Sequence, residues 1–293
     1  MPKFPFAPFR RTARRRTARR RAAIRHAMAA GLGLLLAAAL PAAAQAHRAW
    51  LLPSATVLSG SDPWVTVDAA ISNDLFFFEH FPLRLDELAV TGPDGAAVAV
   101  ENPSTGRYRS TFDLHLDRPG TYRIATAGDG LFASYELNGE RHRWRGTAAE
   151  LPGAIPAGAE KVRLVRSQRR IETFVTAGRP TQTALAATGQ GLELRPVSHP
   201  NDLYAGETAE FELLLDGQPA PDVEVEVIPG GIRYRDRLQS MAVRSDAAGR
   251  LRITWPQPGM YWLGAAVEDG RSGLPGVDRR RAGYAATFEV LPQ

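Results

Sequence analysis

Cysteine is absent from all 293 residues of the chain. This absence excludes disulfide bonds, cysteine-ligated zinc, iron–sulfur clusters and a thiol nucleophile. A hydrophobic core must therefore supply the stability without covalent cross-links. Any bound metal would have to be held by histidine, carboxylate, methionine or backbone groups.

Acidic residues are missing from the first 46 residues, which contain ten of the 36 Lys and Arg of the chain. The basic stretch is followed by an apolar run at residues 27–40 and by Ala44-Gln45-Ala46, the small-x-small form of a signal peptidase site. Because the apolar run is shorter than the roughly 20 residues that span a bilayer, a membrane anchor is less favoured. We predict that residues 1–46 are a signal peptide and that the mature chain, from His47, is periplasmic.

Removal of this segment reverses the sign of the net charge. It leaves 26 Lys and Arg against 31 Asp and Glu, a formal net charge of −5 instead of the +5 of the whole chain. A net-acidic chain gives no electrostatic support for nucleic acid as a partner. We therefore expect no nucleic-acid binding, and no membrane insertion of the mature chain.

Helical periodicity is also scarce after residue 46. Short alternating or β-branched apolar segments recur instead, for example at residues 64–69, 120–125 and 209–215. Turn sequences such as Gly92-Pro93-Asp94-Gly95 and Asp216-Gly217 separate such segments. Many short strands with this spacing predict an all-β protein built as a sandwich or barrel.

The strand pattern is interrupted once, which predicts two domains. Small and polar residues run through 177–191, so we assign residues 47–176 to an N-terminal β-sandwich, 177–191 to a linker and 192–293 to a C-terminal β-sandwich. In the last part, Ser245-Asp246-Ala247-Ala248-Gly249-Arg250 and the segment 259–263 resemble carboxypeptidase-regulatory-like sandwiches. This resemblance implies immunoglobulin-like or transthyretin-like domains, and says nothing of chemistry.

His47 is the first candidate metal ligand among the five histidines that follow residue 46. Cleavage would give it a free α-amine beside its own imidazole. With reference pKa values near 8 and 6.5, both groups release a proton to a metal around neutral pH. The pair predicts a bidentate nitrogen donor suited to nickel, cobalt or copper. The alternative is that His47 is a frayed terminal residue, or only an ordinary residue at the start of the strand that contains Trp50.

His80 and His199 are the candidates for further ligands. His80 ends a phenylalanine-rich run, where aromatic neighbours can exclude water and Glu79 or Asp74 can orient the ring or ligate directly. The alternative is that the phenylalanines pack a core and His80 caps a strand. His199 stands between two prolines at the start of the second domain, and its alternative is a plain turn residue.

The other histidines are not predicted to be ligands. His115 lies in an alternating strand pattern and His142 in a polar, arginine-rich hairpin-like segment. The chain also contains no nucleophile elbow, Walker loop or dinucleotide fingerprint. The sequence therefore does not predict an enzyme.

Three segments resemble an exported family of unknown function, the DUF4198 type. They are the start His47-Arg48-Ala49-Trp50-Leu51-Leu52-Pro53-Ser54, which matches a pattern "AH..WL.PS", and residues 191–207 and 283–290. Members are often described as periplasmic components of cobalt or nickel uptake systems, so the resemblance implies metal handling with His47 as the terminal chelator. Some nickel-binding relatives use a Met-His terminus instead, which leaves a copper-type site open here.

Together these features predict a non-enzymatic periplasmic protein that binds a divalent transition metal, nickel, cobalt or copper, and delivers it to a membrane transporter. His47, His80 and His199 are its predicted ligands. Two alternatives stay open: a metal-free module that binds a cell-envelope partner, and a copper oxidase built on the amino-terminal histidine.

Overall fold

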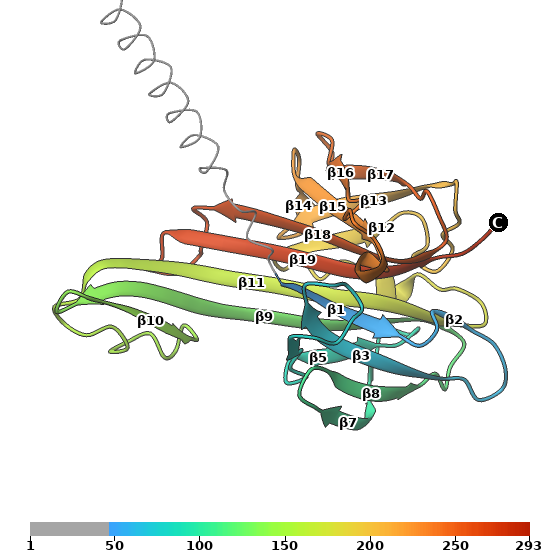
Figure 1. Cartoon of the computed structure of the whole chain (residues 1–293), viewed down its shortest axis with the longest axis horizontal. Helices are drawn as coiled ribbons and strands as arrows, with labels where there is room; N and C mark the ends of the chain where they lie inside the picture. Colours follow the sequence, from blue (N-terminus) through green and yellow to red (C-terminus); the bar gives the residue numbers. More distant parts are fainter. Residues whose placement is uncertain (1–46) are drawn as a thin grey trace, which may run out of the picture. The chain divides into compact units, whose positions relative to one another are not determined.

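β-Strands dominate residues 47–293, the part of the chain that the computed structural model describes (Figure 1). These residues contain no α-helix and two single turns of 3-10 helix, η1 (Thr183–Leu185) and η2 (Ile232–Tyr234). The all-β fold class predicted from the sequence is confirmed. The predicted signal peptide and its cleavage after Ala46 lie outside the described residues.

The first sheet has five strands and is built on a regular inside-outside alternation. In its central strand the side chains of Val65, Val67 and Ala69 are buried, as period-2 patterning requires when one face packs on a core. Its strands, in spatial order, are β1 (Arg48–Pro53), β3 (Trp64–Ser72), β8 (Ser110–His115) and β7 (Glu101–Thr105), with β4 (Phe81–Pro82) paired to one end of β3.

The second sheet has ten strands and runs through both predicted domains. Its main path is β16 (Met241–Arg244), β15 (Glu224–Pro229), β18 (Gly259–Asp269), β19 (Arg279–Val290), β11 (Glu160–Ala177), β9 (Gly120–Leu137), β5 (Leu88–Thr91) and β6 (Ala97–Val98). The short β2 (Val57–Leu58) pairs with β11, and β10 (Glu140–Gly146) pairs with β9. A third, four-stranded sheet contains β12 (Leu192–Pro196), β13 (Thr208–Leu215), β14 (Gln218–Pro219) and β17 (Arg250–Thr254).

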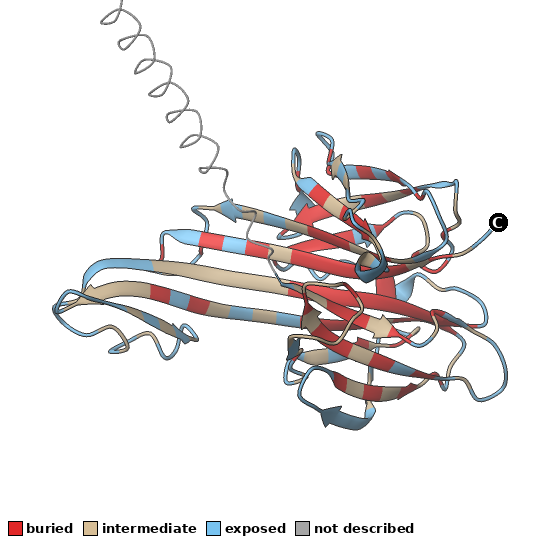
Figure 2. Cartoon of the chain, viewed as in Figure 1, coloured by how far each residue is buried: buried red, intermediate tan, exposed pale blue. Residues whose placement is uncertain are grey.

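The two smaller sheets cover opposite faces of the ten-stranded sheet. On β11, Ile171 and Val175 enter the core shared with the five-stranded sheet, whereas the intervening Phe174 enters the core shared with the four-stranded sheet. On β19, Ala285 and Phe288 are divided in the same way. Strands β11 and β19 are therefore covered on both sides, which explains why residues 170–177 are buried without interruption (Figure 2).

The two sandwiches are not separate bodies. Strands β11 and β19 pair in parallel from Val165↔Arg279 to Thr173↔Thr287, and residues 47–293 form one compact unit. The predicted linker 177–191 contains η1 and buries Ala184 and Leu185. The predicted division into domains 47–176 and 192–293 stays a prediction.

A three-stranded arm extends from the ten-stranded sheet. It comprises residues 130–167, that is, the adjoining halves of β9 and β11 together with β10 (Figure 1). Strands β9 and β10 form a hairpin whose turn residues, Asn138 and Gly139, have φ of 54° and 83°. Two consecutive positive φ values are what a two-residue hairpin turn of the type I′ class needs, and Asn-Gly is its preferred sequence.

Candidate metal site and a second polar pocket

Two of the three predicted ligands, His47 and His80, lie against each other. His47 immediately precedes β1 and His80 immediately precedes β4, and both strands pair with the same end of β3, at Ala49↔Ile71 and Ile71↔Phe81. The two imidazole ring centroids are 3.6 Å apart with an angle of 30° between the planes. Residues 33 positions apart in the sequence thus become neighbours because of strand pairing.

The pair is accessible and offers two imidazole donors. His47 is exposed and His80 is half-buried, with its ring 4.2 Å from that of Phe81. The two rings are tilted against each other, and a common ion would need one nitrogen of each ring to point at it. Among residues 47–293 no group of three or more His, Asp or Glu side chains is placed to hold a metal.

The phenylalanine run before His80 packs on the buried Trp50. The ring centroids of Phe76 and Phe78 lie 5.5 and 5.6 Å from that of Trp50, and the Trp50 Nε1–H donates to Ser72 Oγ at 2.8 Å. The packing interpretation of these aromatics is therefore the one their contacts favour. The same packing fixes the loop that ends at His80 and the strand that begins after His47.

Glu79 stabilises this loop through hydrogen bonds to its backbone. Its Oε1 accepts hydrogen bonds from the backbone N–H groups of Asn73 at 2.8 Å and Asp74 at 2.9 Å. A carboxylate bonded in this way closes the 73–79 loop on itself. These bonds help to fix the loop that carries His80. The role considered from the sequence was different: Glu79 would orient the His80 ring or bind the metal directly.

His199 lies apart from the pair, in a polar network between β9, β11 and the start of the second sandwich. Its Nε2 is 2.9 Å from Thr121 Oγ1, and its Nδ1 accepts the Asn201 backbone N–H at 3.2 Å. Asn201 in turn bonds Thr176, whose hydroxyl donates to Asn201 Oδ1 at 2.8 Å. Burial lowers the pKa of His199, which favours the neutral ring. Both ring nitrogens are thus hydrogen-bonded within the protein, which favours a structural role for His199 over that of a metal ligand.

The remaining two histidines are stacked on aromatic rings. His115 lies 4.5 Å from Trp64, nearly parallel to it, and its Nε2 is 2.7 Å from Asp62 Oδ1. His142 stacks on Tyr135 at 5.4 Å across the β9–β10 hairpin. Their surface strand and hairpin positions agree with the sequence interpretation.

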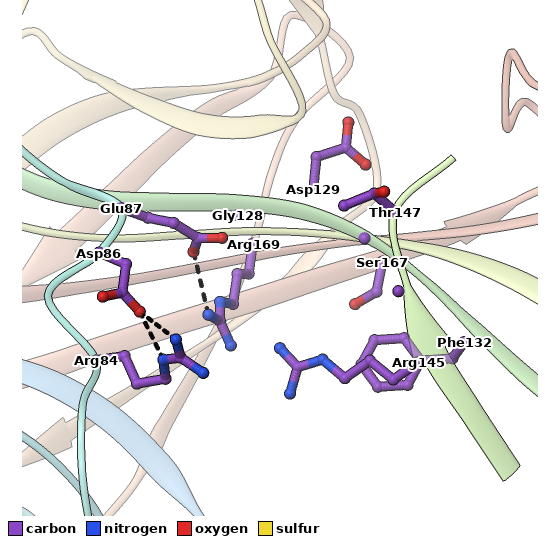
Figure 3. Close-up of a pocket in the computed structure, with 12 residues that line it drawn as sticks. Arg84, Asp86, Glu87, Gly128, Asp129, Phe132, Arg145, Thr147, Ser167 and Arg169 are labelled. Atoms are coloured by element: carbon purple, nitrogen blue, oxygen red, sulfur yellow. Dashed lines mark hydrogen bonds and ion pairs between the residues drawn. The ribbon is translucent and has the colours of Figure 1, made fainter. Parts of the chain in front are cut away.

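A second candidate site, which the sequence did not predict, lies where the arm joins the sheet. This pocket of about 430 Å³ is lined by charged side chains, including Arg84, Glu87, Arg145 and Arg169, above a floor at Gly128 (Figure 3). Arg169 pairs with Glu87 at 3.2 Å. A Cβ on Gly128 would come within 2.5 Å of Glu87 Oε2, so a larger residue here would displace the Glu87 side chain. Of the alternating arginines at 141, 143 and 145 in the sequence, only Arg145 lines this pocket.

The charges of this pocket are nearly balanced. Besides Arg169 and Glu87, Arg84 and Asp86 form an ion pair at 2.5 Å. The Arg145 guanidinium lies 5.2 Å over the ring of Phe132, and in Figure 3 it points into the pocket. The pocket is thus suited to a polar ligand, without a strong preference for either sign of charge.

The chain belongs to the family described as Domain of unknown function (DUF4198), which matches residues 44–269. No curated protein matches the chain. No helix among residues 47–293 combines the length and the apolar character needed to span a membrane.

Solved structures match over most of the chain, but only at low similarity. The D0-D1 domain of intimin is 11% identical, with a TM-score of 0.20, and the match covers 81% of this chain and 96% of that one. The tandem V-type regions of the chitin-binding protein VCBP3 are 8% identical, with a TM-score of 0.18 and coverage of 81% and 98%. The pullulanase SAP of Group B Streptococcus is 10% identical, with a TM-score of 0.16 and coverage of 80% and 23%.

Proposed function

We propose that the protein binds a divalent transition metal, nickel, cobalt or copper, through His47 and His80, and presents it to a membrane transporter without catalysing a reaction. The observation that carries this proposal is the 3.6 Å contact between the two rings. Neutral imidazole is a preferred ligand of these three metals. Two histidines that precede different strands and lie in contact at an accessible edge provide a starting arrangement for such a site.

A third donor follows from the predicted processing. If the chain is cleaved after Ala46, the α-amine of His47 becomes a nitrogen donor on the same residue as one ring. Two imidazoles and one amine then form a three-nitrogen set that leaves positions on the metal for water or for a ligand of the transporter. Such an open set is suited to a protein that must release its cargo.

Calorimetric titration with Ni²⁺, Co²⁺ and Cu²⁺, each in turn, tests the proposal. We expect His47→Ala and His80→Ala each to weaken binding at least about tenfold, equivalent to about 1.4 kcal/mol. His115→Ala is the matched control, because it removes an exposed-strand histidine stacked on an aromatic ring elsewhere in the same sandwich. Binding that is unchanged in both His47→Ala and His80→Ala would overturn the proposal.

The amine can be tested separately from the rings. Mass spectrometry of the purified protein establishes its first residue, and a variant with one glycine inserted before His47 keeps both imidazoles while moving the amine. We expect this insertion to weaken metal binding as strongly as His47→Ala. Full affinity in the insertion variant would leave a two-histidine site and remove the amine from it.

The arm supports a second candidate function, a metal-free module that binds a cell-envelope partner. Residues 130–167 extend away from the two cores and expose large side chains such as Phe132 and Val162. Projecting strands of this kind are suited to contacts with another molecule. Absence of affinity for all three metals would favour this function over the first.

A further inference from the structure

One face of the arm carries a row of exposed arginines. On β10, exposed Arg141, Arg143 and Arg145 alternate with half-buried His142 and Trp144. Alternate residues of a strand point to the same side, so the three guanidinium groups share one face of the arm. Positions two residues apart in a strand are separated by about 6.7 Å.

The other edge of the arm adds two more cations to this face. Arg143 on β10 and Arg163 on β11 both pair with Ser134 of the central strand β9, and directly paired residues lie on the same side of a sheet. Lys161, near Arg163 on β11, is also exposed. The serine is short, so it leaves a gap between the two long arginines.

This gap is part of a hollow of about 250 Å³. Its lining includes Ser134, Glu136, Arg141, Arg143, Lys161 and Arg163. The neighbouring Arg145, which lies over the ring of Phe132, belongs to the pocket at the junction of arm and sheet. The hollow therefore has a small polar residue, Ser134, between cationic side chains from β10 and β11.

The charge in the hollow is strongly unbalanced. Its one carboxylate, Glu136, is bound by Lys161 at 2.6 Å, which lowers the pKa of Glu136. Within residues 47–293, Arg141, Arg143 and Arg163 have no carboxylate within ion-pair distance, although Arg166 and Arg169 on the same strand as Arg163 do. Four cations against one anion give this hollow a net charge of +3 in a mature chain that is expected to be acidic.

We infer that this hollow is a binding site for phosphoryl groups, held between Arg143 and Arg163 above the hydroxyl of Ser134. Guanidinium groups bind phosphate oxygens with paired hydrogen bonds, and a phosphoryl group carries up to two negative charges near neutral pH. Arginines on either side of β9 are about 9.6 Å apart at their Cα atoms, since adjacent strands lie about 4.8 Å apart. Long side chains from both sides can then converge on one tetrahedral anion.

Phosphoryl groups can reach the site on a soluble molecule or on a lipid headgroup. We therefore use two probes, pyrophosphate in calorimetry and sedimentation with vesicles of phosphatidylglycerol in phosphatidylcholine. Saturation by pyrophosphate assigns the site to soluble ligands. Saturable binding to the anionic vesicles, with no affinity for pyrophosphate, assigns it to a headgroup.

Two variants test the site itself. We expect Arg143→Gln with Arg163→Gln to lower affinity for the binding probe at least tenfold. Ser134→Met keeps every cation but fills the gap, and we expect it to weaken binding by a similar factor. Arg252→Gln, which removes an exposed arginine of the C-terminal sandwich, is the control and should bind as the wild type does. All four positions are partly or fully exposed, and circular dichroism verifies the fold.

Each other outcome overturns the inference. Failure of both probes to bind, or binding that survives in the double variant, removes the site. Loss in the double variant with full binding in Ser134→Met means that diffuse positive charge attracts the probe and that no defined pocket exists. None of these readouts depends on His47 or His80, so the site is independent of the proposed metal function.

Discussion

The two halves of strands β9 and β11 belong to the same continuous pairing and have opposite environments. At one end β11 is covered on both faces and all of residues 170–177 are buried, whereas at the other end residues 160–163 are exposed. Side chains change accordingly, from Phe174 and Val175 to Lys161 and Arg163. The comparison shows that strand pairing can extend β9 and β11 well beyond the core when the other half of each strand is anchored in it.

The core half should carry most of the free energy of unfolding. Phe288 is almost fully buried and lies 5.5 Å from Phe211 and 6.2 Å from Phe174. We expect Phe288→Ala to reduce the free energy of unfolding by about 3–5 kcal/mol, because it leaves a large cavity. Phe132→Ala on the arm should cost under about 1 kcal/mol. Urea titration measures the free energy of unfolding of both variants. Equal losses in the two variants would contradict the contrast between the two halves.

The ion pairs at the junction of arm and sheet should contribute less than the core. Asp269 accepts hydrogen bonds from Arg280 at 2.7 and 3.0 Å, and this bonding lowers the pKa of Asp269 to about 2. We expect Asp269→Asn to lower the free energy of unfolding near pH 7 by about 1–2 kcal/mol, discounted for partial solvent screening.

The sign of the pH dependence provides a second check on Asp269. A lowered folded-state pKa gives stability that is complete above the unfolded value near 4 and is lost as the pH falls towards 2. The gap between wild type and Asp269→Asn should therefore close over this interval in acid titrations followed by fluorescence. On the arm, Glu136→Gln removes an exposed pair and should have no measurable effect on unfolding. A stability difference between wild type and Asp269→Asn that stays constant down to pH 2 would contradict the assignment.

The half-buried His199 should give a smaller effect, visible only as pH dependence. Burial lowers its folded-state pKa, so below the unfolded value of about 6.5 the unfolded chain binds more protons and stability falls. We expect His199→Gln to show a shallower loss of stability than wild type between pH 7 and 5. Thermal melts at intermediate pH values measure this slope, and an identical slope in the variant would exclude His199 as its source.

Removing most of the arm should have the smallest effect on the rest of the molecule. Gly130 and Ser167 face each other across β9 and β11, so residues 131–166 can be replaced by an Asn-Gly turn. We expect the shortened protein to fold with its free energy of unfolding changed by no more than about 1 kcal/mol. The proposed phosphoryl site should be lost with the arm. An insoluble product would show that the arm is part of the cooperative unit.

The sequence predicted the fold class well because the signals for strands and turns are local. The segments expected at 64–69, 120–125 and 209–215 fall within β3, β9 and β13. Asp216 and Gly217 have φ of 52° and 74°, as the Asp-Gly turn signal indicates. The great length of β11 was not predictable in this way, since arginine and glutamine interrupt its apolar pattern.

The candidate metal site was predictable only in part. His47 and His80 were chosen from chemistry and their contact depends on the pairing of β1 and β4 with β3, which no local pattern encodes. His199 had equally favourable chemistry, but its neighbours Thr121 and Asn201 occupy both ring nitrogens. Whether a histidine is free to bind is a property of the folded surroundings and not of the residue.

The parallel contact of β11 with β19 also governs the order in which the chain can mature. Thr173 and Thr287 are bonded although 114 residues separate them, so β11 lacks one of its two neighbours until the far segment has been translated. Long-range pairing of this kind slows folding. If the chain is exported as predicted, it would stay incompletely folded, and open to chaperones and proteases, until β19 emerges from the translocon.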